Sequence, residues 1–281
     1  MPTCSRVTLA VLLFLCKVTA FSGGGWIKQP GTLYAKIGLT TLSTNAFHGP
    51  DGSLITTADF TTQTLQFYSE YGILEDLSAV FDIPFLKRSK YITSRAVTGF
   101  GDVGIEFKYG LMSAEIPVAV GVRFELPTGD KNAFGRNLSN PDAIIYLPTG
   151  DGEFNVWARA YASHSFHTFP VFVTLDAGYN FRTQNLTDQY QVGFQLGYKP
   201  VEGLWLFGNV RRLALVGQAN TQLIFNAIGV GEGVEYSSYG MGISYGFLPH
   251  LSISLDAASA FGPVKNIYSG TNVGFGIAVD Y

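Results

Sequence analysis

The sequence has few charged residues and almost no cysteine. Only 14% of its 281 residues are Asp, Glu, Lys or Arg, against roughly 25% in an average soluble domain. Both cysteines, Cys4 and Cys16, fall in the first twenty residues. The remainder therefore has no cysteine for disulfides or for a cysteine-ligated zinc or iron–sulfur site. After residue 20 no apolar run reaches the roughly 18 residues of a membrane-spanning helix, which argues against a helical membrane protein.

Residues 1–20 are typical of a secretory signal peptide. Arg6 precedes an apolar run that ends at Cys16, and a small-residue cleavage site follows at Val18-Thr19-Ala20. This order of charge, apolar run and small residues is the signature of an exported chain. We therefore predict a signal peptide over 1–20 and one domain over 21–281.

The charge balance of the mature chain excludes a further class of partner. Removing residues 1–20 takes away Arg6 and Lys17 and no acid, which leaves 16 basic and 21 acidic residues and a net charge of −5. The cations are scattered along the chain. A mildly acidic chain without a basic stripe is not built to bind nucleic acid.

Apolar residues alternate with polar or small residues along most of the mature chain, which is the pattern of β-strands. From Val273 to Tyr281 every second residue is apolar. Most such segments are about eleven residues long, which matches the roughly 9–11 residues of a tilted membrane-spanning strand. The twelve expected strands are 32–42, 60–73, 77–86, 101–111, 116–127, 153–165, 170–182, 189–199, 204–215, 233–247, 251–260 and 271–281.

The connections between these segments alternate in length. Short turns are expected at 74–76, 112–115, 166–169, 200–203 and 248–250. Longer loops are expected at 43–59, 87–100, 128–152, 183–188, 216–232 and 261–270. An even number of strands, with short turns and both termini on one side and the long loops on the other, is the organisation of a bacterial outer-membrane barrel.

Physical chemistry requires such a sheet to close. Every backbone N–H or C=O left unbonded in hydrocarbon costs several kcal/mol, so an open sheet edge is not tolerated there. We predict an all-β fold: a transmembrane antiparallel up-and-down β-barrel of about 12 strands, with periplasmic termini. Ten or fourteen strands remain alternatives, because 26–42 and 213–235 are ambiguous.

One hairpin allows the register to be predicted. A two-residue turn at Ala114-Glu115 sets Val103 opposite Leu126 and Glu106 opposite Arg123. Shifting the pairing by two residues would place like charges opposite each other, which is unfavourable. We therefore expect a lumen-facing ion pair between Glu106 and Arg123.

Aromatic residues near strand ends are expected at the two lipid headgroup levels. On the short-turn side these are Tyr71, Tyr109, Tyr198, Phe247 and Tyr281. On the opposite rim they are Phe60, Phe181, Tyr190 and Phe261.

Charged residues at the polar, alternate positions of the strands are candidates for the lumen. They are Glu106, Lys108, Arg123, Glu125, Arg159, Asp176, Lys199 and Arg211. Rings of charged side chains set ion preference in pores, so these residues can line a selective substrate pathway. Equally, charges of both signs can form a salt-bridge network that fills a narrow barrel without transport.

Two outer loops carry unusual side chains. Leu223, Phe225 and Ile228 are apolar residues in a loop expected to face water, where they can bind an aromatic or aliphatic solute. The alternative is that they extend a neighbouring strand. Lys87, Arg88 and Lys90 form a basic loop, for which we favour contact with lipopolysaccharide phosphates over simple solvation.

The sequence lacks an arrangement for catalysis, a metal or a cofactor. Of the four histidines, only His250 is followed two residues later by a serine, Ser252, and it lies in a predicted turn without a group to orient it. The repeated Leu-Pro-Thr-Gly-Asp segments, 126–130 and 147–151, are interpreted as turns. We therefore predict that the protein is not an enzyme and holds no metal or cofactor.

A stretch from Thr98 to Asp130 carries a family resemblance. Gly99-Phe100-Gly101-Asp102, followed by Lys108-Tyr109 and Leu126-Pro127-Thr128-Gly129-Asp130, resembles the outer-membrane barrel family associated with meta-pathway phenol degradation. This resemblance implies an outer-membrane transporter that passes hydrophobic or aromatic compounds. The second Leu-Pro-Thr-Gly-Asp at 147–151 departs from the family pattern.

Taken together, these features predict a passive outer-membrane channel or transporter for small hydrophobic or aromatic compounds. Its expected partners are outer-membrane lipid, lipopolysaccharide, the barrel-assembly machinery and the solute itself. The alternative is a non-conducting structural or interaction barrel that binds lipopolysaccharide or a partner through its outer loops.

Overall fold

A computed structural model describes residues 23–113, 115–221 and 231–281. The expected signal peptide, 1–20, lies outside the described residues. Twelve long strands form the wall of a barrel, and all were expected from the alternation. They are β1 (Leu33–His48), β2 (Leu54–Leu74), β3 (Leu77–Tyr91), β5 (Val103–Met112), β6 (Val118–Leu126), β9 (Asn155–Phe166), β10 (Val171–Phe181), β11 (Gln189–Val201), β12 (Leu204–Leu215), β13 (Glu235–Leu248), β14 (Leu251–Lys265) and β16 (Thr271–Asp280).

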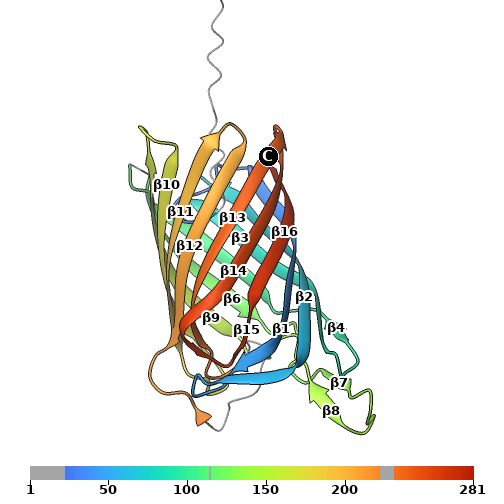
Figure 1. Cartoon of the computed structure of the whole chain (residues 1–281). Helices are drawn as coiled ribbons and strands as arrows, with labels where there is room; N and C mark the ends of the chain where they lie inside the picture. The colour runs from blue at the N-terminus through green and yellow to red at the C-terminus, as the bar shows by residue number, and fades with distance from the viewer. Residues whose placement is uncertain (1–22, 114, 222–230) are drawn as a thin grey trace, which may run out of the picture.

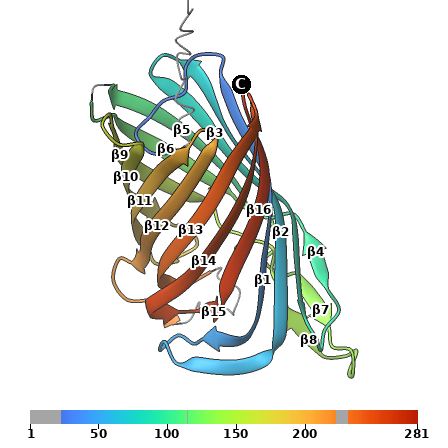
Figure 2. The ribbon, with the colours of Figure 1, turned by 45° about the horizontal axis from the view of Figure 1, so that its top comes forward.

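Each wall strand pairs antiparallel with its neighbours along the chain, and the sheet closes on itself (Figures 1 and 2). The closure is made by β1, which pairs with β2 on one side and with β16 on the other. Closure satisfies the backbone of both terminal strands, as a wall in lipid requires. The wall therefore has twelve strands and not ten or fourteen.

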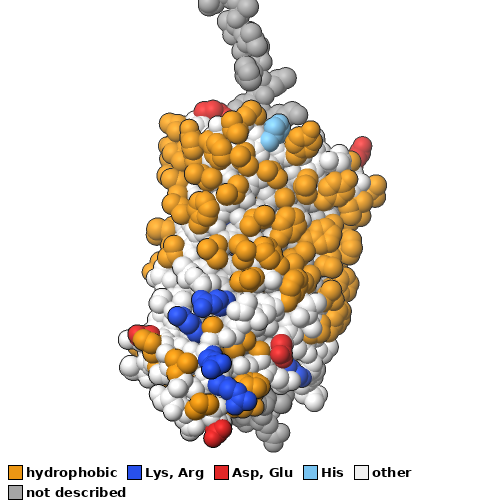
Figure 3. Space-filling model, turned by 90° about the vertical axis from the view of Figure 1, so that its right-hand side faces the viewer, with side chains coloured by type: hydrophobic (Ala, Val, Ile, Leu, Met, Phe, Trp, Pro, Cys, Tyr) orange, Lys and Arg blue, Asp and Glu red, His pale blue; other side chains and the backbone are white. Residues whose placement is uncertain are grey.

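The outer surface is apolar over a broad band next to the short turns and termini (Figure 3). Side chains such as Ile37 and Leu175, 53% and 57% exposed, would be unfavourable in water and are suited to lipid. The expected aromatic residues of the short-turn rim are all exposed, as are Phe181, Tyr190 and Phe261 on the other rim. Among the described residues, no helix is long and apolar enough to cross a bilayer.

The β5–β6 hairpin has the predicted register. Val103 lies opposite Leu126 and Glu106 opposite Arg123, and a bulge beyond Gly110 adjusts the pairing toward the turn. The residue Ala114 of the expected turn lies outside the described residues. The charge pattern therefore predicted the register correctly, although the ion pairs differ from the expected ones, as shown below.

The long-loop end contains more regular structure than the sequence suggested. Four short strands lie there: β4 (Val97–Gly99), β7 (Phe134–Arg136), β8 (Ile144–Tyr146) and β15 (Ile267–Ser269). The β1–β2 hairpin also extends far past the expected strand ends, since β2 alone has 21 residues. A strand of roughly 9–11 residues already crosses a bilayer, so this hairpin projects beyond it.

A small apolar core lies at this long-loop end. Phe60 stacks on Tyr268 with ring centroids 4.0 Å apart, and Leu42 and Leu147 pack with them. The hydroxyls of Tyr91 and Tyr268 are hydrogen-bonded to each other. Phe60 is fully buried, so its expected place at the lipid rim is wrong: it lies on the inward face of β2.

Candidate functional site

The polar inner face of the barrel is the candidate site, and one part of it is densely paired. Lys108 on β5 forms an ion pair of 2.6 Å with Glu70 on β2, and both side chains are only 2% exposed. Glu106 accepts hydrogen bonds from Arg159 Nη1 at 3.2 Å and from the Tyr161 hydroxyl at 2.6 Å. These strands thus carry a network in which charges neutralise each other.

Arg123 also finds partners inside the barrel. Its Nη2 lies 3.1 Å from Asp82 Oδ2 on β3, and its Nε lies 3.1 Å from Glu125 Oε1 on its own strand. The expected ion pair between Glu106 and Arg123 is therefore wrong. The two residues are cross-strand neighbours, but each side chain leans toward a different opposite charge.

Asp176 and Arg211 occupy the far side of this network. Asp176 Oδ1 lies 3.9 Å from Arg211 Nη2, and Asp176 Oδ2 accepts a hydrogen bond of 3.0 Å from Gln191. The Arg211 side chain keeps 47% of its surface exposed, so it is the most exposed of the predicted lumen charges. Lys199, at the short-turn end, pairs with the exposed Glu202 at 2.9 Å.

The segment that precedes β1, residues 23–32, lies inside the short-turn end of the barrel. The Gly25 amide donates to Ser163 Oγ at 2.8 Å, and the Lys28 amide donates to Ser78 Oγ at 2.9 Å. The Lys28 ammonium forms a 2.6 Å ion pair with Asp280. Trp26 packs edge-on against Phe172. These partners belong to β3, β9, β10 and β16, so the segment obstructs part of the lumen.

Two hollows lie beside this segment. One, of about 390 Å³, opens at the short-turn end and is lined by residues that include Tyr34, Trp205, Ser244, Gly246 and Asp280. The second, of about 360 Å³, lies deeper along β1, β2 and the C-terminal strands. Tyr34 lines both hollows, so the two hollows lie near each other along one side of the lumen.

The deeper hollow combines charge with aromatic rings. Lys36 Nζ lies 3.6 Å from Asp256 Oδ1, and both side chains are partly exposed to the hollow. Tyr34 and Tyr68 meet edge to face, with ring centroids 6.1 Å apart. Gly38 adds no side chain, and a Cβ there would meet only ordinary contacts at 3.7 Å. The hollow can therefore accept a small ring that carries a polar group.

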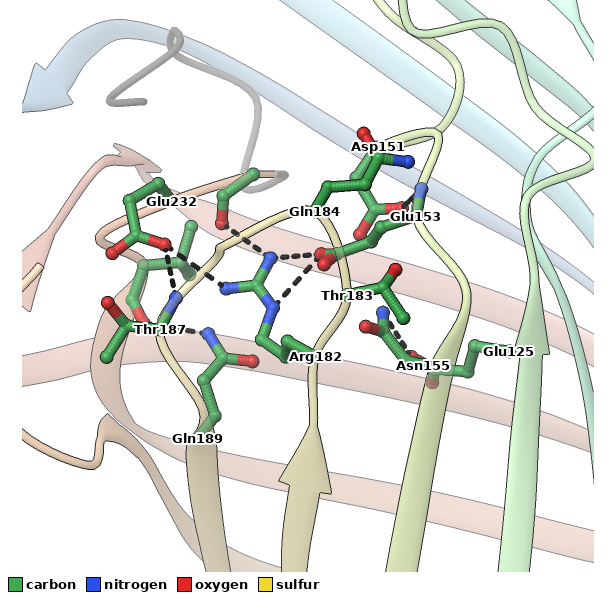
Figure 4. Close-up of polar contacts among 12 residues, drawn as sticks. Glu125, Asp151, Glu153, Asn155, Arg182, Thr183, Gln184, Thr187, Gln189 and Glu232 are labelled. Carbon is green, nitrogen blue, oxygen red and sulfur yellow. Dashed lines mark hydrogen bonds and ion pairs between the residues drawn. The ribbon is translucent and has the colours of Figure 1, made fainter. Parts of the chain in front are cut away.

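At the long-loop end, Arg182 joins three loops (Figure 4). Its Nε donates to Glu153 Oε1 at 3.0 Å, and its Nη2 donates to the Gly231 carbonyl at 3.1 Å. Its Nη1 lies 3.9 Å from Glu232 Oε2, which also accepts a hydrogen bond from the Thr187 amide. One buried guanidinium thus connects the loops that precede β9, β11 and β13.

Asp151 lies beside this cluster, outside the membrane-spanning strands (Figure 4). Burial, followed by the hydrogen bond and negative charge of Glu153, raises the pKa of Asp151 to about 7. Glu153 Oε2 has no hydrogen-bond partner among the described residues. The cluster therefore tends to hold an additional proton near neutral pH.

The repeated Leu-Pro-Thr-Gly-Asp segments meet at a single carboxylate. Asp102 Oδ1 accepts a hydrogen bond from the Gly129 amide, and Asp102 Oδ2 accepts one from the Asp151 amide, both at 2.9 Å. The Asp130 amide donates to the Thr149 hydroxyl between the two segments. The second segment therefore completes a clasp with the first, and its Leu147 enters the apolar core.

The structure places the remaining predicted residues as follows. Lys87 turns inward and donates to the Thr149 carbonyl at 3.3 Å, whereas Arg88 and Lys90 are exposed on the outer wall. Leu223, Phe225 and Ile228 lie outside the described residues. His250 Nδ1 lies 2.6 Å from the Asp280 carbonyl oxygen in a short turn, which is a structural contact.

Several residues of the site were missed. Glu70, Asp82 and Arg182 all lie on the polar parity of expected strands, so the alternation that identified Glu106 could have identified them too. The inward course of residues 23–32 had no comparable signal. It follows from tertiary contacts with Ser78, Ser163 and Asp280.

A closed antiparallel barrel with an apolar outer band and a polar interior defines the class of outer-membrane β-barrels. No family model matches the sequence, and no curated protein matches it. In fold, the chain is similar to the COG4313 outer membrane channel from Pseudomonas putida F1, with a TM-score of 0.67 and 13% identity over 92% of this chain and 98% of that one. At this identity the likeness concerns the fold alone.

Two further solved structures have lower TM-scores. A mutant of the TodX monoaromatic hydrocarbon channel has a TM-score of 0.49 and 10% identity, over 89% of this chain and 90% of that one. The KdgM porin in complex with oligogalacturonate has a TM-score of 0.47 and 6% identity, over 89% and 99%. At these scores the likeness supports no inference about this chain.

Proposed function

We propose that this protein is a passive outer-membrane channel for small aromatic or hydrophobic solutes. The observation that carries the proposal is the path formed by the two hollows that share Tyr34. The path lies beside the paired charges and beside residues 23–32, so it is the part of the lumen with room for a solute. No energy source is needed, because the solute moves down its own gradient.

The lining of the path supports an aromatic solute. Tyr34 and Tyr68 present ring edges in the deeper hollow, and Trp205 lines the opening at the short-turn end. Lys36 and Asp256 offer one group of each charge for a polar substituent. Aromatic side chains favour edge-to-face contacts with other rings, which makes a phenol or a simple aromatic acid a suitable solute.

Membrane assembly requires further partners. We propose that the barrel resides in the bacterial outer membrane after signal-peptide export, and that assembly machinery recognises its terminal strand, β16, with the aromatic Tyr281. No catalytic role is proposed. His250, which is followed two residues later by Ser252, is held by the Asp280 carbonyl and packs against Tyr281.

Single-channel conductance of the refolded mature protein in a planar bilayer tests the channel. We expect discrete openings that phenols or aromatic acids block. Gly38→Phe should reduce the conductance several-fold, because it fills the deeper hollow. Leu39→Phe is the matched control, because Leu39 is the next residue and faces lipid at 43% exposure. Equal effects of the two variants would contradict the proposed path.

The second candidate is a non-conducting structural or interaction barrel. Residues 23–32 and the buried Lys108–Glu70 pair obstruct the lumen, and this favours a closed barrel. A fully inserted protein without any openings, both with and without residues 23–32, would support this candidate and would contradict an aqueous path.

A further inference from the structure

The outer wall near the long-loop end changes abruptly from apolar to cationic. On neighbouring strands, Leu39 pairs with Leu65 and Leu65 pairs with Leu86, which forms an apolar row across β1, β2 and β3. Two residues farther along, the corresponding row is Thr41, Gln63 and Arg88. Two residues are about 7 Å of strand, so the polar boundary is sharp.

A second polar row follows the first. Ser43 pairs with Thr61, and Thr61 pairs with Lys90. Because side chains alternate along a strand, these residues share the outward face with the apolar row below them. We call Thr41, Gln63 and Arg88 together with Ser43, Thr61 and Lys90 the cationic shelf. Figure 3 shows Lys and Arg side chains on this side of the barrel just beyond the apolar band.

The two cations of the shelf are Arg88 and Lys90, and their polar neighbours differ from those of other cations at this end of the barrel. Arg88 Nη1 lies 3.5 Å from the Gln63 side-chain oxygen, and among the described residues no carboxylate lies within ion-pair distance of Arg88 or Lys90. By contrast, Arg212 and Lys265, at the same end of the barrel, share Glu235 at 2.9 and 3.0 Å.

The surroundings of Lys90 provide further hydrogen-bonding groups. Lys90 lines an outer hollow with Ser43, Thr61 and Asp59, and the Ser43 and Thr61 hydroxyls lie 3.3 Å apart. With the one carboxylate of Asp59 included, the charge of this region is +1. Hydroxyls next to unpaired cations suit a ligand that presents both sugar hydroxyls and phosphates.

We propose that the cationic shelf binds the phosphorylated sugar headgroup of lipid A in the outer leaflet. The proposal rests on the outer-membrane placement given above, but not on conduction. Acyl chains would pack on the apolar row of Leu39, Leu65 and Leu86. The glucosamine phosphates would then reach the height of Arg88 and Lys90, where a guanidinium can bind phosphate through two hydrogen bonds.

Binding of lipid A to the full mature protein in detergent tests this proposal. The titrants are bisphosphorylated lipid A, dephosphorylated lipid A and phosphatidylglycerol, followed by native mass spectrometry. Each cation near a charged lipid surface contributes roughly a five-fold gain in binding, so Arg88→Gln with Lys90→Gln should weaken binding of bisphosphorylated lipid A about 25-fold. The same variant should bind dephosphorylated lipid A as the wild type does.

Two control variants distinguish a specific effect of the cationic shelf from a general effect of net charge and from misfolding. Lys131→Gln with Arg136→Gln removes two exposed cations from a loop at the same end and should leave lipid A binding unchanged. Arg88→Lys with Lys90→Arg keeps both charges and should keep most of the binding. An equal loss in the loop variant, or equal wild-type affinity for dephosphorylated lipid A or phosphatidylglycerol, would overturn the proposal. Neither outcome depends on whether the protein conducts.

Discussion

Individual side chains inside this barrel are accommodated by glycine on the neighbouring strand. A Cβ at Gly121 would collide with the Glu106 carboxylate, and one at Gly104 would collide with the Arg123 guanidinium. A Cβ at Gly193 would likewise collide with the Asp176 carboxylate. On the inward face of the wall, long charged side chains therefore lie beside glycines. The space at each glycine lets the charged side chain lie along the wall and reach its partner.

The buried pair of Lys108 and Glu70 gives a prediction about stability. Lys108→Met should lower the free energy of unfolding by about 3–5 kcal/mol, because it removes the ammonium that neutralises the buried Glu70 carboxylate. Adding Glu70→Leu should recover much of this loss. Urea unfolding in lipid vesicles measures both effects.

The control for this prediction is the exposed pair of Lys199 and Glu202. Lys199→Met should cost less than about 1 kcal/mol, because the carboxylate of Glu202 is 80% exposed and water screens the interaction. Comparable losses at the two pairs would contradict the importance of burial.

Asp151 gives a prediction about pH. Its pKa is raised from 3.8 to about 7 in the folded protein, so folding favours the protonated acid. The wild type should therefore lose stability as the pH rises from about 4 to 7, and recover it as the pH falls. The shift of the Asp151 pKa would change the free energy of unfolding by at most about 4 kcal/mol. We expect a change of about 2 kcal/mol, because solvent screens charges in a loop.

The Asp151→Asn variant should lack this pH dependence, because the amide cannot ionise. Urea unfolding at several pH values measures the difference between the two proteins, and hydrogen exchange in residues 147–153 measures its local part. A variant whose stability follows the same pH profile as the wild type would show that another group is responsible.

At the scale of elements, the segment 23–32 and the outer loops close opposite ends of the barrel by different means. The segment uses inward hydroxyls and the Lys28–Asp280 pair. The loops use Arg182, Asp102 and an apolar core around Phe60. The segment also packs the Trp26 ring edge-on against Phe172, whereas the loops bury stacked aromatic rings.

Deleting residues 23–32 should raise single-channel conductance several-fold, because the segment occupies lumen cross-section beside the short-turn hollow. Trp26→Ala should give a smaller rise, since it removes only the ring that packs on Phe172. Leu39→Phe, on the lipid face, serves as the control. Unchanged conductance in the deletion variant would place the narrowest point of the path elsewhere.

The whole molecule is divided along its axis into an apolar band near the termini and a polar long-loop end (Figure 3). This division predicts its orientation, since outer-membrane barrels have short periplasmic turns and longer external loops. Residues 21–281 contain no cysteine, so a single cysteine introduced there reports on its own position.

Asp142→Cys, in the loop between β7 and β8, should react with a membrane-impermeant maleimide on intact cells. Glu202→Cys, in a short turn, should react only after the outer membrane is permeabilised. Labelling is read by mass spectrometry of the purified protein. The opposite pattern would reverse the orientation.

The site could be predicted only in part from the sequence. Glu106, Lys108 and Arg123 were found because side chains alternate along a strand, which places these residues on the inner face of the barrel. Their partners Glu125 and Arg159 were also found, whereas Glu70, Asp82 and Tyr161 were not named. Which of these groups pair with each other could not be predicted, because the sequence does not align their strands. Phe60 was misplaced because it was assigned to the lipid rim from its position at a strand end, whereas the regular pairing of β2 with β1 from Tyr71 to Phe60 places it on the face opposite to that of Tyr71.

The sequence by itself determined the β-barrel class, the strand order and the apolar outer face, and it favoured twelve strands, a number that the closure of β1 on β16 then fixed. These depend on local alternation with a period of two, and on the requirement that a sheet in lipid must close. Only the tertiary structure decided what lies inside the barrel. The course of residues 23–32, the clasp at Asp102 and the hub at Arg182 depend on side chains far apart in the chain, which barrel closure brings together.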